Sequence, residues 1–131
     1  VGCMAGIGME VCQRLAAQDI GATVVDPRWV KPVPDEIVEL AARHRLVVTI
    51  EDNGVVGGVG AAVAGRLRGA DCATEARTIG IPQRFLDQGS RAQVLADAGL
   101  TAQQVGHQVI GWITAKSPML DVPTGLDEKA E

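Results

Sequence analysis

Residues 46–67 read LVVTIEDNGVVGGVGAAVAGRL, and this stretch decides the fold class. Its first five residues are apolar or β-branched, which is typical of a strand buried on both faces of a parallel sheet. Acidic residues break the run, a glycine-rich turn follows, and small residues then continue as a helix able to lie close to the sheet. A strand, a glycine turn and a helix in this order predict an α/β protein.

The segments on either side extend the same alternation. Apolar residues four apart predict an amphipathic helix over residues 6–18, and residues 34–44 predict a second one. The β-branched run at residues 22–25 predicts a short buried strand. Residues 77–81 predict a weaker strand, which Pro82 ends. Helices and strands therefore alternate, and we expect an α/β sandwich with a largely parallel sheet.

The last third of the chain is predicted to be helical. Ser90-x-x-Gln93 and Thr101-x-x-Gln104 both match the capping box that begins a helix, and Gly99 is placed to end the helix between them. We expect one domain over residues 1–116. Residues 117–131 carry little periodicity and are predicted to be a disordered tail.

Composition excludes several functional classes. The chain has 131 residues, a net charge of −4 and 2% aromatic residues, so neither a phosphate-backbone binder nor a stacking platform for bases is expected. No apolar run reaches the ~20 residues needed to cross a bilayer, so no membrane partner is expected. The three cysteines form no C-x-x-C pair, which argues against a zinc site or a disulfide framework and favours the cytoplasm.

One loop is a candidate site. It consists of the acidic strand end and the glycine turn, namely Glu51, Asp52, Asn53, Gly57, Gly58 and Gly60. Backbone N–H groups at the start of the following helix would suit an anion, although glycine is also needed for a tight turn and close helix–sheet packing. The carboxylates would suit metal binding or acid–base work, or alternatively a cap, turn or interface.

No catalytic or metal-binding residue is assigned. His44 and His107 lie on predicted helices without partners for chemistry nearby in sequence, and no nucleophile motif surrounds Ser90. Arg77 and Arg91, like Arg84, would suit phosphate, but surface or interface ion pairs are the simpler interpretation.

Four segments resemble one family in order and spacing. Residues 24–32, VVDPRWVKP, are similar to the Val-Asp-x-Arg-x-Val-Lys-Pro segment of the C-terminal, transketolase-like domain of the 1-deoxy-D-xylulose-5-phosphate synthase family. Residues 49–60 resemble its acidic strand end and glycine turn, and residues 79–86, IGIPQRFL, its Gly-x-Pro-x-x-Phe loop. Residues 89–101 look like its closing helices. Pro27 and Gln83, together with the short tail, look closest to actinobacterial members of the family.

The resemblance implies a function for a longer polypeptide. Such enzymes condense pyruvate with glyceraldehyde 3-phosphate for isoprenoid, thiamine and pyridoxal synthesis, with thiamine diphosphate and Mg²⁺ bound by two preceding domains. The C-terminal domain would supply packing and homodimer contacts, and no catalytic residue carries over to it. It would hold a mixed sheet of about five strands whose first strand lies mostly before Val1; loss of a short leader is the other explanation for this start.

Two alternatives stay open. The chain would also suit the equivalent domain of transketolase or of a 2-oxo-acid dehydrogenase β subunit. A free-standing module that binds an anion or nucleotide at the Gly57 turn belongs to a different class. Val55 and Val56 fill the turn where many of the resembled enzymes carry a polar residue, which argues against substrate contact there.

Overall fold

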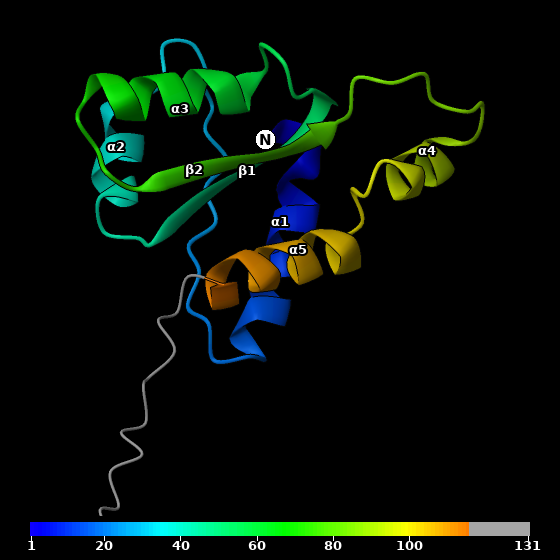
Figure 1. Ribbon diagram of the computed structural model, residues 1–131, viewed down its shortest axis with the longest axis horizontal. Helices are drawn as coiled ribbons and strands as arrows, with labels where there is room; N and C mark the ends of the chain where they lie inside the picture. Colours follow the sequence, from blue (N-terminus) through cyan, green and yellow to red (C-terminus); the bar gives the residue numbers. More distant parts are fainter. Residues whose placement is uncertain (116–131) are drawn as a thin grey trace, which may run out of the picture.

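A computed structural model describes residues 1–115 of the chain (Figure 1), so the predicted tail at residues 117–131 lies outside the described residues. The elements, in chain order, are η1 (Gly2–Met4), α1 (Ala5–Ala16), α2 (Asp35–Ala41), β1 (Leu46–Gly54), α3 (Val59–Gly69), β2 (Glu75–Ile81), α4 (Arg91–Asp97) and α5 (Ala102–Ala115). Among the described helices, none is long and apolar enough to cross a lipid bilayer.

The described part of the sheet is parallel, as expected. β1 pairs with β2 from Leu46 opposite Glu75 to Ile50 opposite Ile79, and α3 makes the crossover between them. The prediction that acidic residues end the strand at Ile50 was wrong, because β1 continues to Gly54, which pairs with Ile81 after an irregularity. The strand continues because its backbone keeps a partner on β2 beyond the acidic residues.

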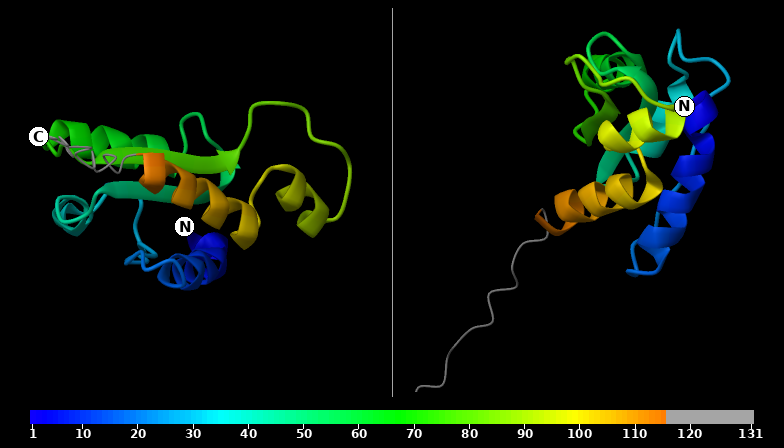
Figure 2. Two further views of the ribbon diagram at one scale, coloured as in Figure 1. Left: turned by 60° about the horizontal axis from the view of Figure 1, so that its bottom comes forward. Right: turned by 90° about the vertical axis from the view of Figure 1, so that its right-hand side faces the viewer.

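Helices cover both faces of the strands, which confirms the α/β/α arrangement. Figures 1 and 2 show α3 on one side of the strands and α1 with α5 on the other. Each face has its own hydrophobic core, worth about 1.5–3 kcal/mol per fully buried large side chain. The core under α1 and α5 contains Met4, Val11, Leu15, Ile79, Leu100, Ala102, Val105 and Val109. The core under α2 and α3 contains Ala41, Val63 and Leu67.

The strand predicted at residues 22–25 was wrong. These residues pair with no strand of the described chain, and the sheet that the described residues form has two strands, which is compatible with the predicted α/β class. The apolar β-branched side chains Val24 and Val25 are 36% and 44% exposed. A β-branched run becomes a strand only when a neighbour accepts its backbone hydrogen bonds, and β1 does not lie directly beside this run.

Both predicted capping boxes are confirmed. The Gln93 N–H donates to Ser90 Oγ (3.3 Å), and the Ser90 N–H donates to Gln93 Oε1 (2.9 Å). The same reciprocal pair joins Thr101 and Gln104 at 3.3 Å in each direction. Gly99 has φ of +77°, the left-handed conformation that ends α4 and that glycine adopts most readily.

Candidate functional site

The candidate loop lies at the edge of the sheet where β1 and β2 both end. The C-terminal end of β1 contains Glu51, Asp52 and Asn53, and the loop after Gly54 leads to the start of α3. Gly57 has φ of +73°, so the chain reverses through a conformation that favours glycine. The Asn53 side chain is exposed, whereas Glu51 is 1% exposed.

Glu51 binds the N-terminus of α3. Its Oε2 accepts from the Val59 N–H (2.7 Å) and its Oε1 from the Gly60 N–H (3.1 Å). The first turn of a helix presents unpaired N–H groups and a partial positive charge, which together stabilise a carboxylate. The helix donors that would suit an anion at this glycine turn therefore bind the chain's own carboxylate, and an external anion would have to displace it to use the same two donors.

Two glycines allow this close approach. A Cβ on Gly58 would lie 2.3 Å from Glu51 Oε2 and 2.8 Å from the Gly54 carbonyl oxygen. A Cβ on Gly60 would lie 2.1 Å from Thr78 Oγ1 and 2.5 Å from Thr49 Oγ1. Side chains at both positions are thus excluded by sterics, as the close-packing interpretation of these glycines predicted.

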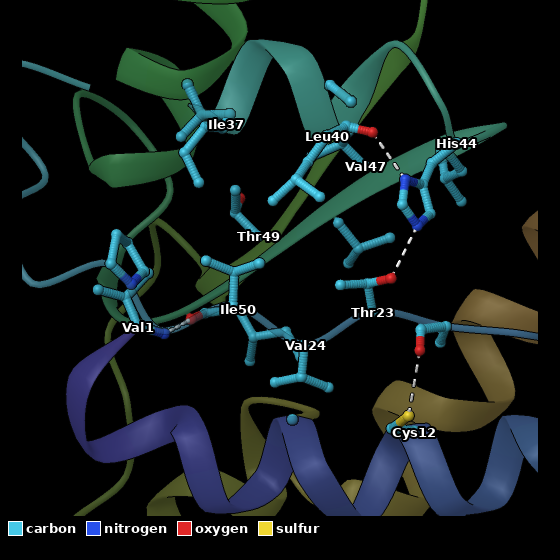
Figure 3. Close-up of a pocket in the computed structure, with 18 of the residues that line it drawn as sticks. Val1, Cys12, Thr23, Val24, Ile37, Leu40, His44, Val47, Thr49 and Ile50 are labelled. Carbon is cyan, nitrogen blue, oxygen red and sulfur yellow. Dashed lines mark hydrogen bonds between the residues drawn. The ribbon is translucent and has the colours of Figure 1, made fainter. Parts of the chain in front are cut away.

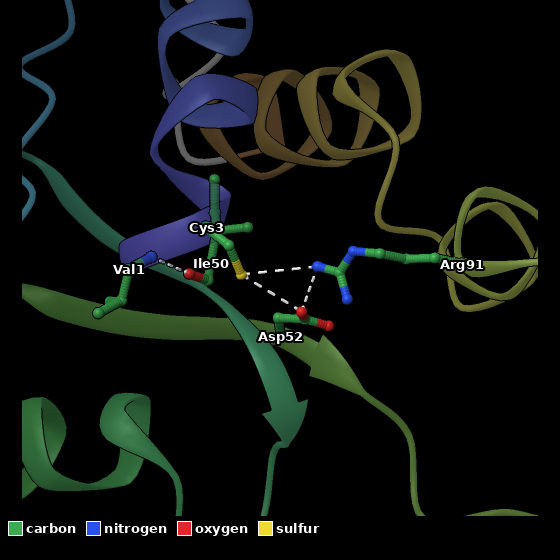
Figure 4. Close-up of polar contacts among 5 residues, drawn as sticks. All are labelled: Val1, Cys3, Ile50, Asp52 and Arg91. Atoms are coloured by element: carbon green, nitrogen blue, oxygen red, sulfur yellow. Dashed lines mark hydrogen bonds and ion pairs between the residues drawn. The ribbon is translucent and has the colours of Figure 1, made fainter.

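Asp52 forms a second polar cluster with residues far away in sequence. Figure 4 shows its carboxylate ion-paired with the Arg91 guanidinium, while Cys3 Sγ lies 3.3 Å from Asp52 Oδ2 and 3.5 Å from Arg91 Nη2. The hydrogen bond from Arg91 lowers the pKa of Asp52 below its ordinary value, and the reciprocal bond raises the pKa of Arg91. The cluster ties η1 and α4 to the end of β1.

The arginines expected to form ion pairs do so. The pairs are Arg77 with Glu75, Arg84 with Asp97 (2.7 Å) and Arg91 with Asp52. The Arg77 guanidinium also lies 4.9 Å from the centroid of the Trp112 ring, a distance suited to cation–π contact. Each of these three guanidinium groups has an acidic partner, so none of the three is unpaired and available for a phosphate.

A groove opens on the opposite side of β1 from β2. It has a volume of about 250 Å³ and is lined mainly by apolar side chains of α1, residues 20–30, α2 and β1. In Figure 3, His44 closes one end, with Nδ1 2.7 Å from the Leu40 carbonyl oxygen and Nε2 2.9 Å from Thr23 Oγ1. Because a carbonyl only accepts, Nδ1 carries a proton in this arrangement, and the Thr23 hydroxyl can either donate to Nε2 or accept from it. His107 is exposed on α5, away from these partners.

A family model assigns most of the chain. The model described as "Transketolase, C-terminal domain" matches residues 1–105. The chain belongs to this family.

Relatives of this transketolase C-terminal domain are longer proteins. The chain is 55% identical over 115 residues to "1-deoxy-D-xylulose-5-phosphate synthase" of Mycobacterium avium (strain 104), a match that covers 88% of the chain and 18% of that protein. It is 47% identical over 131 residues to the protein of the same name from Mycobacterium sp. (strain KMS), covering 100% of the chain and 20% of that protein. The chain thus spans about a fifth of the length of these relatives.

A solved structure supports the fold. The domain matches a chain described as "Split gene transketolase, inactive beta4 tetramer" with a TM-score of 0.75 and 31% identity. The match covers 85% of this chain and 36% of the other. The α/β class inferred from residues 46–67 is thereby confirmed.

Thiamine diphosphate and Mg²⁺ do not fit the described residues of this transketolase C-terminal domain. Within residues 1–115 no three His, Cys, Asp or Glu side chains come together as a metal-ligand set. The helix N-terminus that would suit a diphosphate is bound by Glu51.

Proposed function

We propose that this chain is the C-terminal domain of a 1-deoxy-D-xylulose-5-phosphate synthase. The observation that carries the proposal is its 55% identity over 115 residues to the Mycobacterium avium protein of that name. Identity of this extent over 88% of the chain supports a shared activity for the protein to which the domain belongs. The match to the split-gene transketolase is weaker, at 31%.

In this proposal the complete enzyme condenses pyruvate with glyceraldehyde 3-phosphate and releases carbon dioxide. Thiamine diphosphate with Mg²⁺ would supply the stabilised carbanion, held by the preceding domains. The contribution of this chain is structural: Glu51 and the glycine turn fix the loops at the sheet edge, and those loops contact the rest of the enzyme. The three free cysteines suit a reducing cytoplasm, where the enzyme would supply isoprenoid, thiamine and pyridoxal synthesis.

Exposed apolar side chains mark the proposed contacts. Phe85 is fully exposed at 103%, and Val56 is 67% exposed; both lie in loops at the sheet edge where β1 and β2 end. Trp29 is 70% exposed on the segment before α2. Aromatic side chains are enriched in the buried centres of protein interfaces, so we propose that Phe85 packs against a preceding domain or the homodimer partner.

A chimera tests the proposed activity. This chain would replace the matched 115 residues of the Mycobacterium avium synthase, and turnover of pyruvate and glyceraldehyde 3-phosphate would be measured with the cofactors present. We expect turnover by the chimera and none by the isolated chain. A folded, dimeric chimera without turnover would contradict the proposal, as would binding of thiamine diphosphate by the isolated chain in calorimetric titration.

Matched variants test the proposed contact. In the chimera, Phe85→Ser is expected to lower turnover and the melting temperature, whereas Gln83→Ser, an exposed change in the same loop, is expected to alter neither. In the isolated chain the two variants should have the same melting temperature, because neither side chain is buried there. If the two variants had the same turnover and the same melting temperature in the chimera, Phe85 would not be part of the interface.

The second candidate is the equivalent domain of a transketolase, which the 31% identity to the split-gene protein favours. The same replacement in that protein decides between the two. Activity of the transketolase chimera together with inactivity of the synthase chimera would favour the second candidate.

A further inference from the structure

The segment between β2 and α5 carries no buried side chain. None of residues 82–99 is buried, whereas Ile79 before the segment and Leu100 after it are 6% and 0% exposed. Figures 1 and 2 show the loop after β2 and then α4 projecting beyond the carboxyl ends of β1 and β2. The position of this segment therefore depends on a small number of individual interactions.

Interactions within the segment close it into a unit. The Arg84 guanidinium donates to the Asp97 carbonyl oxygen (3.2 Å) and to the Asp97 carboxylate (2.7 Å), which joins the loop to the last residue of α4. The capping box of Ser90 and Gln93 fixes the start of the helix. The seven residues of α4 are fewer than the roughly 12–15 that an isolated helix needs in water, so this helix depends on such contacts.

The contacts between this unit and the rest of the domain lie on two sides. On the side of α5, Leu95 packs against the core, and the Gln104 side chain donates to the Ala96 carbonyl oxygen (3.0 Å). On the side of the sheet, the Arg91 guanidinium is ion-paired with the Asp52 carboxylate at the end of β1 (Figure 4). The helix is thus held by α5 on one side and by a single ion pair on the other.

These two sets of contacts lie at opposite ends of α4. Arg91 is the first residue of the helix, whereas Leu95 and Ala96 lie in its last turn, next to Gly99. A helix of this length spans about 10 Å. Within residues 1–115, every hydrogen bond that joins residues 83–93 to η1 or to the sheet starts from the Arg91 guanidinium. Loss of that contact would leave the start of α4 unanchored while its end stays against α5.

We propose that residues 82–98 form a hinged arm and that the ion pair between Asp52 and Arg91 is its latch. With the latch closed, the start of α4 lies against the end of β1. With the latch open, the start of α4 moves away together with the loop that carries Phe85, and the end of α4 is the hinge. The Arg91 side chain is 59% exposed and the Asp52 side chain 20%, so dissolved salt screens the latch. The inference concerns a motion of this chain and does not depend on the proposed enzymatic activity.

Amide hydrogen exchange of the full chain, read at Val94, tests the arm. The Val94 N–H donates to the Ser90 carbonyl oxygen (2.9 Å) in the first turn of α4, so its exchange reports the loss of that turn when the latch no longer holds it. We expect exchange at Val94 to be faster than in β1 and nearly independent of urea at low concentration, because opening the arm alone exposes little surface. Exchange at Val94 that rises with urea in step with the amides of β1 would overturn the arm, since the segment would then open only with the whole domain.

Substitutions test the latch. Asp52→Asn and Arg91→Gln should each speed exchange at Val94 by about two- to fivefold, the range expected for an exposed ion pair. Asp35→Asn is the matched control, because it removes an exposed carboxylate whose ion pair with Arg66 (2.6 Å) joins α2 to α3, and it should leave exchange at Val94 unchanged. Equal exchange at Val94 in the parent chain and in both latch variants would overturn the latch.

Salt tests the latch without any substitution. Added sodium chloride should speed exchange at Val94 in the parent chain toward the rate of Asp52→Asn, because salt screens an exposed ion pair. It should have no such effect on Asp52→Asn, in which the ion pair is already absent. The same response to salt in the parent chain and in Asp52→Asn would overturn the latch.

Discussion

Replacing Gly60 with alanine tests whether close contact between α3 and the sheet fixes the candidate loop. Gly60 is the second residue of α3, and its N–H donates to Glu51. A methyl group there would lie 2.1 Å from Thr78 Oγ1, 2.5 Å from Thr78 Cγ2 and 2.5 Å from Thr49 Oγ1. Carbon atoms in proteins pack at about 3.5–4.0 Å, so each contact is too short by about 1 Å or more.

The cost follows from what must move. Either α3 lifts from β1 and β2, or the threonine side chains rotate and break the Thr49–Thr78 hydrogen bond of 3.1 Å. Overpacking of a well-filled site costs about 1–3 kcal/mol, and a lost hydrogen bond about 1 kcal/mol. Up to ~1 kcal/mol of this loss is offset, because alanine has a higher helix propensity than glycine. We expect a net loss of about 1–3 kcal/mol.

The same helix supplies the control. A Cβ on Gly65 would meet no atom within 4 Å, so Gly65→Ala gains helix propensity without a clash and is expected to stabilise the chain by about 0.5–1 kcal/mol. Urea unfolding of the two variants and the parent chain, followed by circular dichroism, measures both effects. At about 4 °C per kcal/mol, Gly60→Ala should also lower the melting temperature by about 4–12 °C.

A rescue variant separates the clash from other causes. Thr78→Ala removes both atoms of Thr78 that the new methyl group would meet, so the double variant should be more stable than the sum of the single effects by about 0.5–3 kcal/mol. Strict additivity would refute the clash, and so would a Gly60→Ala variant as stable as Gly65→Ala.

Three further changes test the polar contacts of the sheet edge. Glu51→Gln turns an NH₂ group toward the donors of α3, and its urea midpoint should show a loss of about 1–3 kcal/mol, with the exposed Glu36→Gln unchanged. Asp52→Asn should destabilise the chain at pH 7, because a carboxyl group whose pKa is lowered in the folded state stabilises that state at pH values above its ordinary pKa of 3.8. The difference in unfolding free energy from the parent chain should shrink as the pH falls below 3.8, and a pH-independent difference would exclude the ionised carboxylate as its cause. Ser90→Ala removes a cap and should cost about 1 kcal/mol in thermal unfolding, with faster amide exchange confined to α4.

Local sequence signals predicted most of the fold. The helices α1, α3 and α5 followed from apolar spacing and small residues, and the capping boxes fixed where α4 and α5 begin. The error at residues 22–25 has a physical cause: β-propensity is local, but a strand exists only beside a partner, and the neighbouring position is the groove.

The candidate site was predictable only in part. Glu51 was singled out at the strand end, but its role as the acceptor for α3 depends on a contact with Val59, eight residues further along the chain. A signal was present, since α3 begins after Gly58 with no side chain able to cap it. The contact of Arg91 with Cys3 joins residues 88 positions apart, and no local pattern indicates such a pair.

Glu51 places a carboxylate of the chain itself at the helix N-terminus of this sheet edge. In open α/β sheets, the carboxyl ends of the strands and the following helix N-terminus commonly bind an anionic ligand. Here a carboxylate from β1 binds the α3 donors, glycines at 58 and 60 bring helix and strands too close for another group, and Asp52 is bound by Arg91. With Glu51 and Asp52 paired internally, the exposed apolar side chains at this edge are Val56 and Phe85, which suits the contact with a preceding domain or the homodimer partner that we propose.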